Sequence, residues 1–171
     1  MVKIPKVHGG NVHKASRLLH TSLDKILDYS ANINPLGMST KGMDAVNVAF
    51  QHVIHYPDPD MTDLFAITSK LWDMPKECIA FGNGAAELIY AICRLPKIEA
   101  VYVPAPGFSE YSHGAHSCGL TVIEYELQFD KESIHFAYPL DTILHHLNQS
   151  KNRLVFIGNP NNPCGTLWKD R

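Results

Sequence analysis

The sequence predicts an α/β protein with a mainly parallel sheet and helices on both of its faces. Short apolar runs at 100–103, 120–127 and 154–157 have the length and composition of buried strands. Between these runs, apolar residues recur at the spacing of amphipathic helices. Because strands that alternate with helices are joined by crossover connections, they pair in parallel. A parallel sheet covered by helices is therefore the expected architecture of most of the chain.

The first third of the chain lacks this alternation. Residues 1–35 hold a glycine loop, a short basic amphipathic stretch and a polar loop, and residues 40–53 predict a helix. A rigid turn, Tyr56-Pro57-Asp58-Pro59-Asp60, follows, since each proline restricts both itself and the residue before it. We therefore divide the chain into an N-terminal arm with a small-domain segment, residues 1–59, and a large domain, residues 60–171.

The large domain predicts its elements in regular order. We expect a helix with Leu64, Ile67, Leu71 and Trp72 on one face, capped by Asp60 or Thr62. The elements that follow are a strand at 78–81, a helix from about Gly84, a strand at 100–103 ended by Pro104, a helix at 108–118 stopped by Gly119, a strand at 120–127, a helix bearing Leu140, Ile143, Leu144 and Leu147, and a strand at 154–157.

Composition excludes several classes of function. The chain has 171 residues, 45% of them apolar, which suits a globular protein with a real core, and its net charge of −2 indicates no nucleic-acid surface. We find no apolar stretch long enough to cross a bilayer and no secretory signal. The cysteines are scattered, as in a cytoplasmic protein with reduced thiols. The histidine pairs His113/His116 and His145/His146 lack a third ligand, so no metal is expected.

A glycine loop joins the predicted strand at 78–81 to the next helix. It reads Gly82-Asn83-Gly84-Ala85-Ala86-Glu87. Glycines permit a close backbone approach to a ligand, and the free amides of a helix start favour a phosphate. A plain tight turn is the alternative. A dinucleotide site is disfavoured, because Glu87 replaces the third glycine of that fingerprint and would set a negative charge beside a pyrophosphate.

Two further loops follow predicted strands. Pro104 to Tyr111 contains Phe108, whose ring has the flat surface needed to stack on a planar cofactor, although a core role is the alternative. The loop Gly158-Asn159-Pro160-Asn161-Asn162-Pro163-Cys164-Gly165 offers neutral amide donors. An amide from Asn162 would suit a phenolate-like oxygen, whereas turn formation alone is the other interpretation. Each loop closes a strand, at the edge where open α/β sheets bind ligands.

Taken together, these motifs resemble the fold-type-I enzymes that use pyridoxal 5'-phosphate (PLP), the aspartate aminotransferase superfamily. The matching stretches run in family order through nearly the whole chain. They are residues 8–11 (His-Gly-Gly-Asn), 28–37 (Asp-Tyr-Ser-Ala-Asn-Ile-Asn-Pro-Leu-Gly), 56–59, 82–87, 106–111 and 159–165. Within the superfamily, the first two stretches favour the L-threonine-O-3-phosphate decarboxylases of cobalamin biosynthesis over the histidinol-phosphate aminotransferases.

The resemblance implies a role for each matching residue. Gly84, Ala85 and Ala86 would cradle the PLP phosphate, Phe108 would stack on the pyridine ring and Asn162 would bond the 3'-oxygen. Tyr56 would reach the cofactor of the second subunit in a homodimer. His8 and Asn32 would line the pocket for a small phosphorylated amino-acid substrate, although an exposed loop histidine is an equal alternative for His8.

The resemblance also implies what this chain lacks. The family places its Schiff-base lysine well beyond the asparagine loop, and Lys169 lies too close to that loop to match it. We therefore expect the catalytic lysine beyond Arg171, the last residue of this chain, and no catalytic residue within it. The chain would then be a truncated, incomplete PLP-binding domain that is inactive alone. A histidinol-phosphate-type aminotransferase, or a non-catalytic module that binds PLP or a partner, are the alternatives to a decarboxylase.

Overall fold

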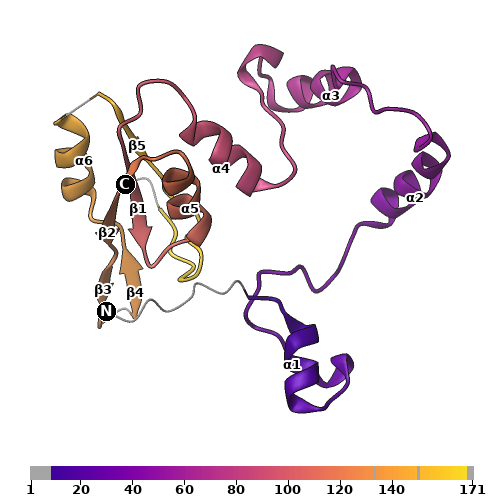
Figure 1. The fold of residues 1–171 in the computed structure, drawn as a ribbon, viewed down its shortest axis with the longest axis horizontal. Coiled ribbons are helices and arrows are strands. Elements are labelled where there is room, and N and C mark those ends of the chain that lie inside the picture. The colour runs from indigo at the N-terminus through magenta and orange to yellow at the C-terminus, as the bar shows by residue number, and fades with distance from the viewer. Residues whose placement is uncertain (1–8, 133, 150, 169–171) are drawn as a thin grey trace. The chain divides into compact units, whose positions relative to one another are not determined.

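The computed structural model describes residues 9–132, 134–149 and 151–168, and the chain divides into two compact units (Figure 1). The first unit comprises residues 1–79 and the second comprises residues 80–171. These units are groups of residues in mutual contact. The functional division of the chain at residue 60 stays a prediction.

The first unit is helical in its described part. It contains α1 (Val12–Leu19), α2 (Thr40–Ala49) and α3 (Thr62–Trp72), with the 3₁₀ turns η1 (Leu23–Lys25), η2 (Phe50–His52) and η3 (Lys76–Cys78). Side chains cap the first two helices: Asn11 accepts from the Lys14 amide, and Ser39 accepts from the Gly42 amide. The helix predicted over 40–53 is confirmed as α2 with η2.

The start of α3 corrects the predicted cap. The N-cap is Met61, in the left-handed region with φ 46°, rather than Asp60 or Thr62. The carboxylate of Asp58 accepts from the Thr62 amide at 2.8 Å and so satisfies the helix start from outside it. Hydrogen bonds from Thr62 and Asp60 lower the pKa of Asp58. The proline-framed turn places this carboxylate at the helix, a position that local sequence spacing does not reveal.

The second unit contains the parallel sheet. Its strands β1 (Ala100–Ala105), β2 (Thr121–Glu126) and β5 (Arg153–Val155) lie in the order β2-β1-β5, and both pairings are parallel. Tyr102 stands in register with Ile123 on one side and Val155 on the other. The prediction of a parallel sheet is thus confirmed. An antiparallel hairpin of β3 (Gln128–Asp130) and β4 (His135–Ala137) was not predicted.

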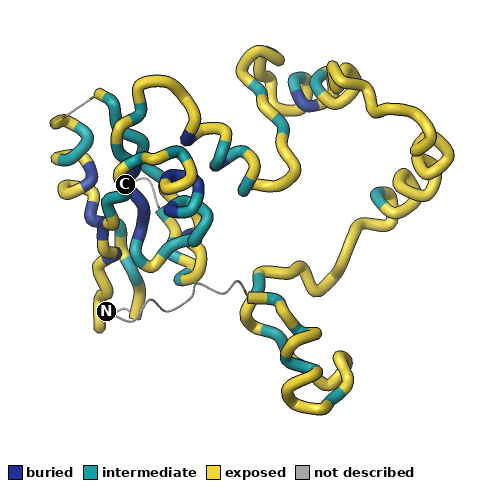
Figure 2. Tube along the Cα trace, in the orientation of Figure 1, coloured by how far each residue is buried: buried dark blue, intermediate teal, exposed yellow. Residues whose placement is uncertain are grey.

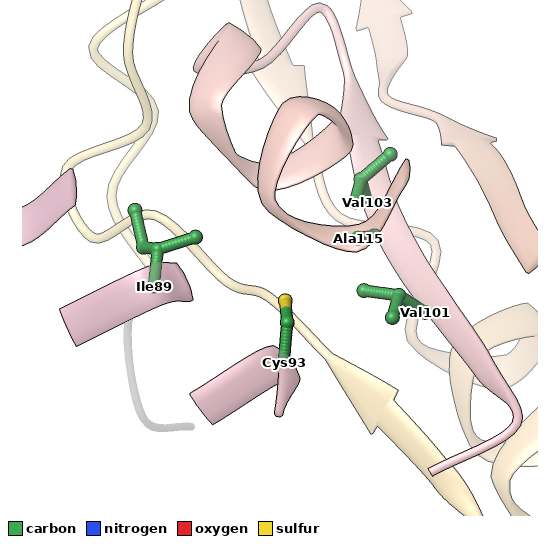
Figure 3. Close-up of a cluster of buried hydrophobic side chains, with 5 residues drawn as sticks. All are labelled: Ile89, Cys93, Val101, Val103 and Ala115. Carbon is green, nitrogen blue, oxygen red and sulfur yellow. The ribbon is translucent and has the colours of Figure 1, made fainter. Parts of the chain in front are cut away.

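Helices cover both faces of this sheet, as predicted (Figure 1). From α4 (Ala85–Cys93) and α5 (Ser109–Ser117), Ile89, Cys93 and Ala115 pack with Val101 and Val103 of β1 (Figure 3). From α6 (Leu140–Asn148), Ile143 packs on the other face in a second cluster with Tyr102, Tyr125 and Leu127. Successive residues of β1 therefore serve two cores, as the alternation of side chains in a strand requires.

Two strand predictions need correction. Residues 78–81 form no strand: Cys78 ends η3, and Ile79 is extended but pairs with no strand among the described residues. Pro104 does not end β1, which continues to Ala105. The Phe156 amide donates to the Tyr102 carbonyl, so the backbone of Tyr102 faces β5. The backbone of Pro104, two residues later, faces the same side. Because the β5 pairing ends at Tyr102, the missing N–H of Pro104 costs no ladder bond.

Burial differs sharply along the chain (Figure 2). All nine hydrophobic residues of the described core belong to the second unit, whereas Thr68 is the buried residue found in the described part of the first. None of the helices in the described residues has the length and apolar character needed to span a bilayer.

Candidate cofactor site

The loop before α4 has the geometry of an anion cradle. Gly84 is the N-cap of α4, has φ +84° and carries no side-chain cap. A Cβ built on Gly84 would meet no atom within 4 Å, so the space beside this backbone is open. The first amides of a helix have no acceptor within the helix, and the helix dipole gives them partial positive charge. An open helix start of this kind fits the phosphate group of PLP.

Individual amides of this loop differ in their availability. The Gly84 amide already donates to the Gly82 carbonyl at 2.9 Å. The carboxylate of Glu87 folds back to accept from the Asn83 amide. Ala85 and Ala86 occupy the first two positions of α4, where amides lack an intrahelical acceptor. They are the better donors among the three predicted phosphate ligands.

Phe108 stands at the N-cap of α5, in the loop that follows β1. It is half-buried, and its ring meets Tyr111 edge-on with centroids 5.7 Å apart. Tyr111 in turn stacks on Phe156, with centroids 4.6 Å apart and planes 9° apart. Phe108 therefore packs partly on the core and keeps part of its surface exposed.

The asparagine loop follows β5 and closes on itself. The Asn161 amide donates to the Thr166 carbonyl at 2.8 Å, and the Gly165 amide donates to the Asn161 carbonyl at 2.7 Å. Asn162 is exposed, and in the described part of the chain its side chain has no hydrogen-bond partner. Its amide is thus available to a ligand.

The loops that carry Phe108 and Asn162 meet at one edge of the sheet. Since β1 and β5 are parallel neighbours, their carboxyl ends lie together. The side-chain amide of Asn161 also donates to the Pro106 carbonyl at 3.0 Å and so joins the asparagine loop to the loop that precedes Phe108. The structure therefore brings the loops of Phe108 and Asn162 into direct contact.

The remaining predicted residues belong to the first unit. Tyr56 is fully exposed and Asn32 is exposed, whereas His8 lies outside the described residues. The loop after His8 lies against the segment before Asn32, because the Gly10 amide donates to the Ser30 hydroxyl at 2.7 Å. A Cβ on Gly9 would lie 1.7 Å from the Ser30 carbonyl oxygen, so this approach requires glycine. The roles of Tyr56, Asn32 and His8 stay predictions.

The prediction about the catalytic lysine concerns the end of the chain. Lys169, which sequence spacing excludes as the Schiff-base lysine, and Arg171, beyond which that lysine is expected, both lie outside the described residues. The position of the lysine beyond Arg171 therefore stays a prediction, as does the inactivity of this chain alone.

Sequence reasoning did not single out the groups that support the asparagine loop. The hydroxyl of Tyr125 donates to the Phe156 carbonyl at 2.6 Å, and that of Tyr138 donates to the Gly158 carbonyl. Burial raises the pKa of both phenols, that of Tyr138 to about 12, so both stay protonated as donors at neutral pH. Nothing in the local pattern marks these tyrosines, since both partners are distant in sequence.

Cys164 is a further loop residue whose environment only the structure reveals. Burial raises the pKa of its thiol, but hydrogen bonds from Thr166 and Asn161 outweigh burial, and the net pKa is below the usual value. The Asn161 side-chain amide lies 3.0 Å from the Cys164 sulfur.

Comparison with known proteins identifies the family. The model of the family Aminotransferase class I and II matches residues 24–171, so the chain belongs to this family. Membership of this family indicates PLP as the cofactor, in agreement with the cofactor predicted from the motifs. The resemblance to fold-type-I PLP enzymes is thereby confirmed.

Two curated relatives and one solved structure illustrate the similarity. A threonine-phosphate decarboxylase of Salmonella typhimurium is 32% identical over 98% of this chain and 44% of its own length. A histidinol-phosphate aminotransferase of Bdellovibrio bacteriovorus is 36% identical over 84% of this chain and 39% of its own. The structure of a histidinol-phosphate aminotransferase from Sinorhizobium meliloti in complex with PLP shares the fold, with a TM-score of 0.70, 22% identity and coverage of 81% and 36% of the two chains. The chain spans less than half the length of these relatives.

Proposed function

We propose that the full-length protein decarboxylates L-threonine O-3-phosphate to (R)-1-amino-2-propanol O-2-phosphate in cobalamin biosynthesis. The observation that carries this proposal is the similarity to a threonine-phosphate decarboxylase over 98% of the chain. Two stretches that this resemblance rests on, residues 8–11 and 28–37, lie in the first unit, and Gly10 and Ser30 are in contact there. We further propose that the protein is a cytoplasmic homodimer.

In this proposal each part of the second unit has a binding task. The amides of Ala85 and Ala86 hold the cofactor phosphate, because they are helix-start donors beside an open glycine backbone. Phe108 covers one face of the ring, and Asn162 donates its amide to the 3'-oxygen. When bound, PLP supplies an electron sink for the bond that breaks.

The first unit carries the proposed substrate contacts. His8 and Asn32 would orient the phosphorylated amino acid so that the bond to its carboxylate stands perpendicular to the cofactor ring. Tyr56 would contact the phosphate of the PLP that the neighbouring subunit binds. The complete exposure of Tyr56 in this chain permits such a contact. The ring chemistry is common to decarboxylases and transaminases, so this orientation decides which bond breaks.

The relatives also support a second candidate, a histidinol-phosphate-type aminotransferase. The relative named for that activity has the higher identity, 36%, although it covers less of the chain. A third candidate is a non-catalytic module that binds PLP or a partner.

A direct assay separates these candidates. The full-length protein with PLP is given L-threonine O-3-phosphate, and carbon dioxide release is measured. A parallel reaction offers histidinol phosphate with 2-oxoglutarate, and glutamate is measured. We expect carbon dioxide alone. Glutamate formation without carbon dioxide would establish the aminotransferase, and PLP binding without either product would establish the non-catalytic module. Because the Schiff-base lysine is expected beyond Arg171, the 171-residue chain alone should show no turnover above a control with free PLP.

One substitution and a matched control test the proposed contact between Asn162 and the cofactor without any substrate present. Loss of a hydrogen bond to a charged group costs about 1.5–3 kcal/mol, so Asn162→Ala should weaken PLP binding by about 10- to 100-fold. Asn47→Ala, in exposed α2, is the matched control and should leave the dissociation constant unchanged. Equal affinities in an absorbance titration would remove Asn162 from the site.

A further inference from the structure

Asn161 is an unusual residue for an exposed loop. The residue is 2% exposed, whereas its neighbours Pro160 and Asn162 are both exposed. Burial of a primary amide is costly unless hydrogen bonds replace the water that it loses. Hydrogen bonds from Asn161 to other protein groups therefore have to compensate for the water that it loses.

Both amide hydrogens of Asn161 are used, and they point to different parts of the site. Nδ2 lies 3.0 Å from the Pro106 carbonyl oxygen and 3.0 Å from the Cys164 sulfur. The backbone of Asn161 meanwhile closes the asparagine loop through Thr166 and Gly165. One residue thus shapes its own loop and fastens that loop to the loop after β1.

The other end of the carboxamide is tightly enclosed. Oδ1 is buried and has no hydrogen-bond partner among the described residues. A Cβ built on Gly158 would lie 3.1 Å from Oδ1 and 3.4 Å from the Tyr111 hydroxyl. Gly158 therefore leaves the space in which the Asn161 side chain lies, and Tyr111 borders the same space.

The two loops joined by Asn161 carry the two proposed ring contacts. Pro106 is two residues before Phe108, and Asn161 directly precedes Asn162. We propose that Asn161 is a positioning residue whose carboxamide sets the distance between Phe108 and Asn162, an inference that rests on the proposed cofactor site. The Tyr111–Phe156 stack also joins the same two regions, but ring stacking has less directional demand than a hydrogen bond and so fixes their relative position less closely.

The chain offers a matched control at the opposite end of the same strand pair. Asn152, just before β5, donates its side-chain amide to Glu99, just before β1, at 2.7 Å. This contact also joins the β1 and β5 segments through one carboxamide, but it lies at the amino ends of the strands, away from the proposed site. If any carboxamide link between the β1 and β5 segments were sufficient for cofactor binding, Asn152→Ala would weaken that binding as Asn161→Ala does.

The test compares Asn161→Ala and Asn161→Asp with Asn152→Ala in the full-length protein. Asn161→Asp keeps the side-chain shape but sets a carboxylate oxygen against the Pro106 carbonyl. We expect both Asn161 variants to weaken PLP binding by about tenfold or more, as for a lost hydrogen bond in a buried site, and to shift the absorption maximum of bound PLP. Asn152→Ala should change neither quantity. Affinities and spectra of both Asn161 variants equal to those of Asn152→Ala would overturn the proposal.

Thermal unfolding without PLP guards against a trivial loss of structure. Ile143→Ala, in α6, serves as a destabilised reference, because its core cluster on the other face of the sheet includes no proposed ligand residue. A tenfold affinity loss in an Asn161 variant whose Tm exceeds that of Ile143→Ala supports positioning, and an equal affinity loss in Ile143→Ala contradicts it. Should Asn161→Asp not fold, Asn161→Ser replaces it under the same criteria. The readout is cofactor binding, so a failed decarboxylase assay would refute the proposed function and leave this comparison valid.

Discussion

The two units of this chain use apolar residues in opposite ways. In the first unit, Ile67, Leu71 and Trp72 of α3 are 66%, 75% and 61% exposed. In the second unit, Ile89 of α4 is 6% exposed and Val101 of β1 is 0% exposed. Both sets follow helical or strand periodicity. The difference is that the second unit supplies a sheet against which its helices pack.

An amphipathic pattern thus specifies a helix or a strand, but it does not specify the surface against which that helix or strand packs. The predicted helices of both units form, yet the described part of the first unit buries little of its apolar surface. Contiguous exposed apolar surface is typical of sites where other protein surfaces bind.

The same substitution should have very different costs in the two units. Ile89→Ala removes a side chain from a closed core and should lower the free energy of unfolding by about 2–5 kcal/mol. Ile67→Ala, on exposed α3, should change it by about 0.5 kcal/mol or less. Urea unfolding followed by circular dichroism measures both. Similar losses for the two variants would show that α3 is packed as tightly as α4.

A tyrosine pair tests the polar contacts in the same way. Tyr125→Phe leaves the partly buried Phe156 carbonyl without its donor and should cost about 1–3 kcal/mol. Tyr29 is 88% exposed in the first unit, so Tyr29→Phe is the control and should be nearly neutral. The midpoint of urea unfolding reports both changes, and a neutral Tyr125→Phe would mean that the Tyr125 hydroxyl contributes nothing.

The pH dependence of thiol reactivity tests the asparagine loop. The thiolate is the reactive form. Because hydrogen bonds hold the pKa of Cys164 below its usual value, its alkylation should become half-maximal at a lower pH than that of free cysteine. Burial raises the pKa of Cys93, which should react at higher pH. Peptide mass spectrometry after iodoacetamide treatment resolves each site. Asn161→Ala should move the Cys164 midpoint upward, and an unmoved midpoint would exclude that hydrogen bond.

The smallest effect concerns Asp28. Hydrogen bonds from the Ser30 hydroxyl and amide lower the pKa of Asp28. Because the folded-state pKa is depressed, the stabilising contribution is present above the unfolded pKa and is lost as pH falls through the folded pKa. The amide resonance of Ser30 should therefore titrate below the usual range for aspartate, about 3.9. Asp28→Asn should abolish that titration and leave resonances of the second unit unchanged. A titration at or above the usual value would contradict the contact.

Local sequence was informative where a single element decides the outcome. The start of α4 after Gly84 and the end of α5 before Gly119 follow from glycine backbone freedom, and both are observed. Residues 78–81 were predicted wrongly, because a strand exists only through a ladder with a neighbour. Pro104 was predicted to end β1, but the pairing of β1 with β5 ends before it, at Tyr102, so the amide that proline lacks has no ladder partner there.

The candidate site shows the same limit. The three loops were located from glycine, proline and asparagine spacing, but within the asparagine loop the sequence suggested a role for Asn162 and none for Asn161. Burial separates them: Asn161 is enclosed and bonded to Pro106, while Asn162 is exposed. That distinction depends on a residue 55 positions away, which no local pattern contains.

The amino-acid sequence alone was enough to predict the α/β class, most helix and strand positions and the candidate ligand-binding loops, because these predictions depend on periodicity and on residues with special backbone properties. The resemblance to PLP enzymes came from the motifs in those loops. Tertiary structure alone decided the order β2-β1-β5, the β3–β4 hairpin, the cap from Asp58 and the pairing of Asn161 with Pro106. These features rest on groups that meet only after the chain has folded, when a hydrogen bond or a packed surface compensates for lost water.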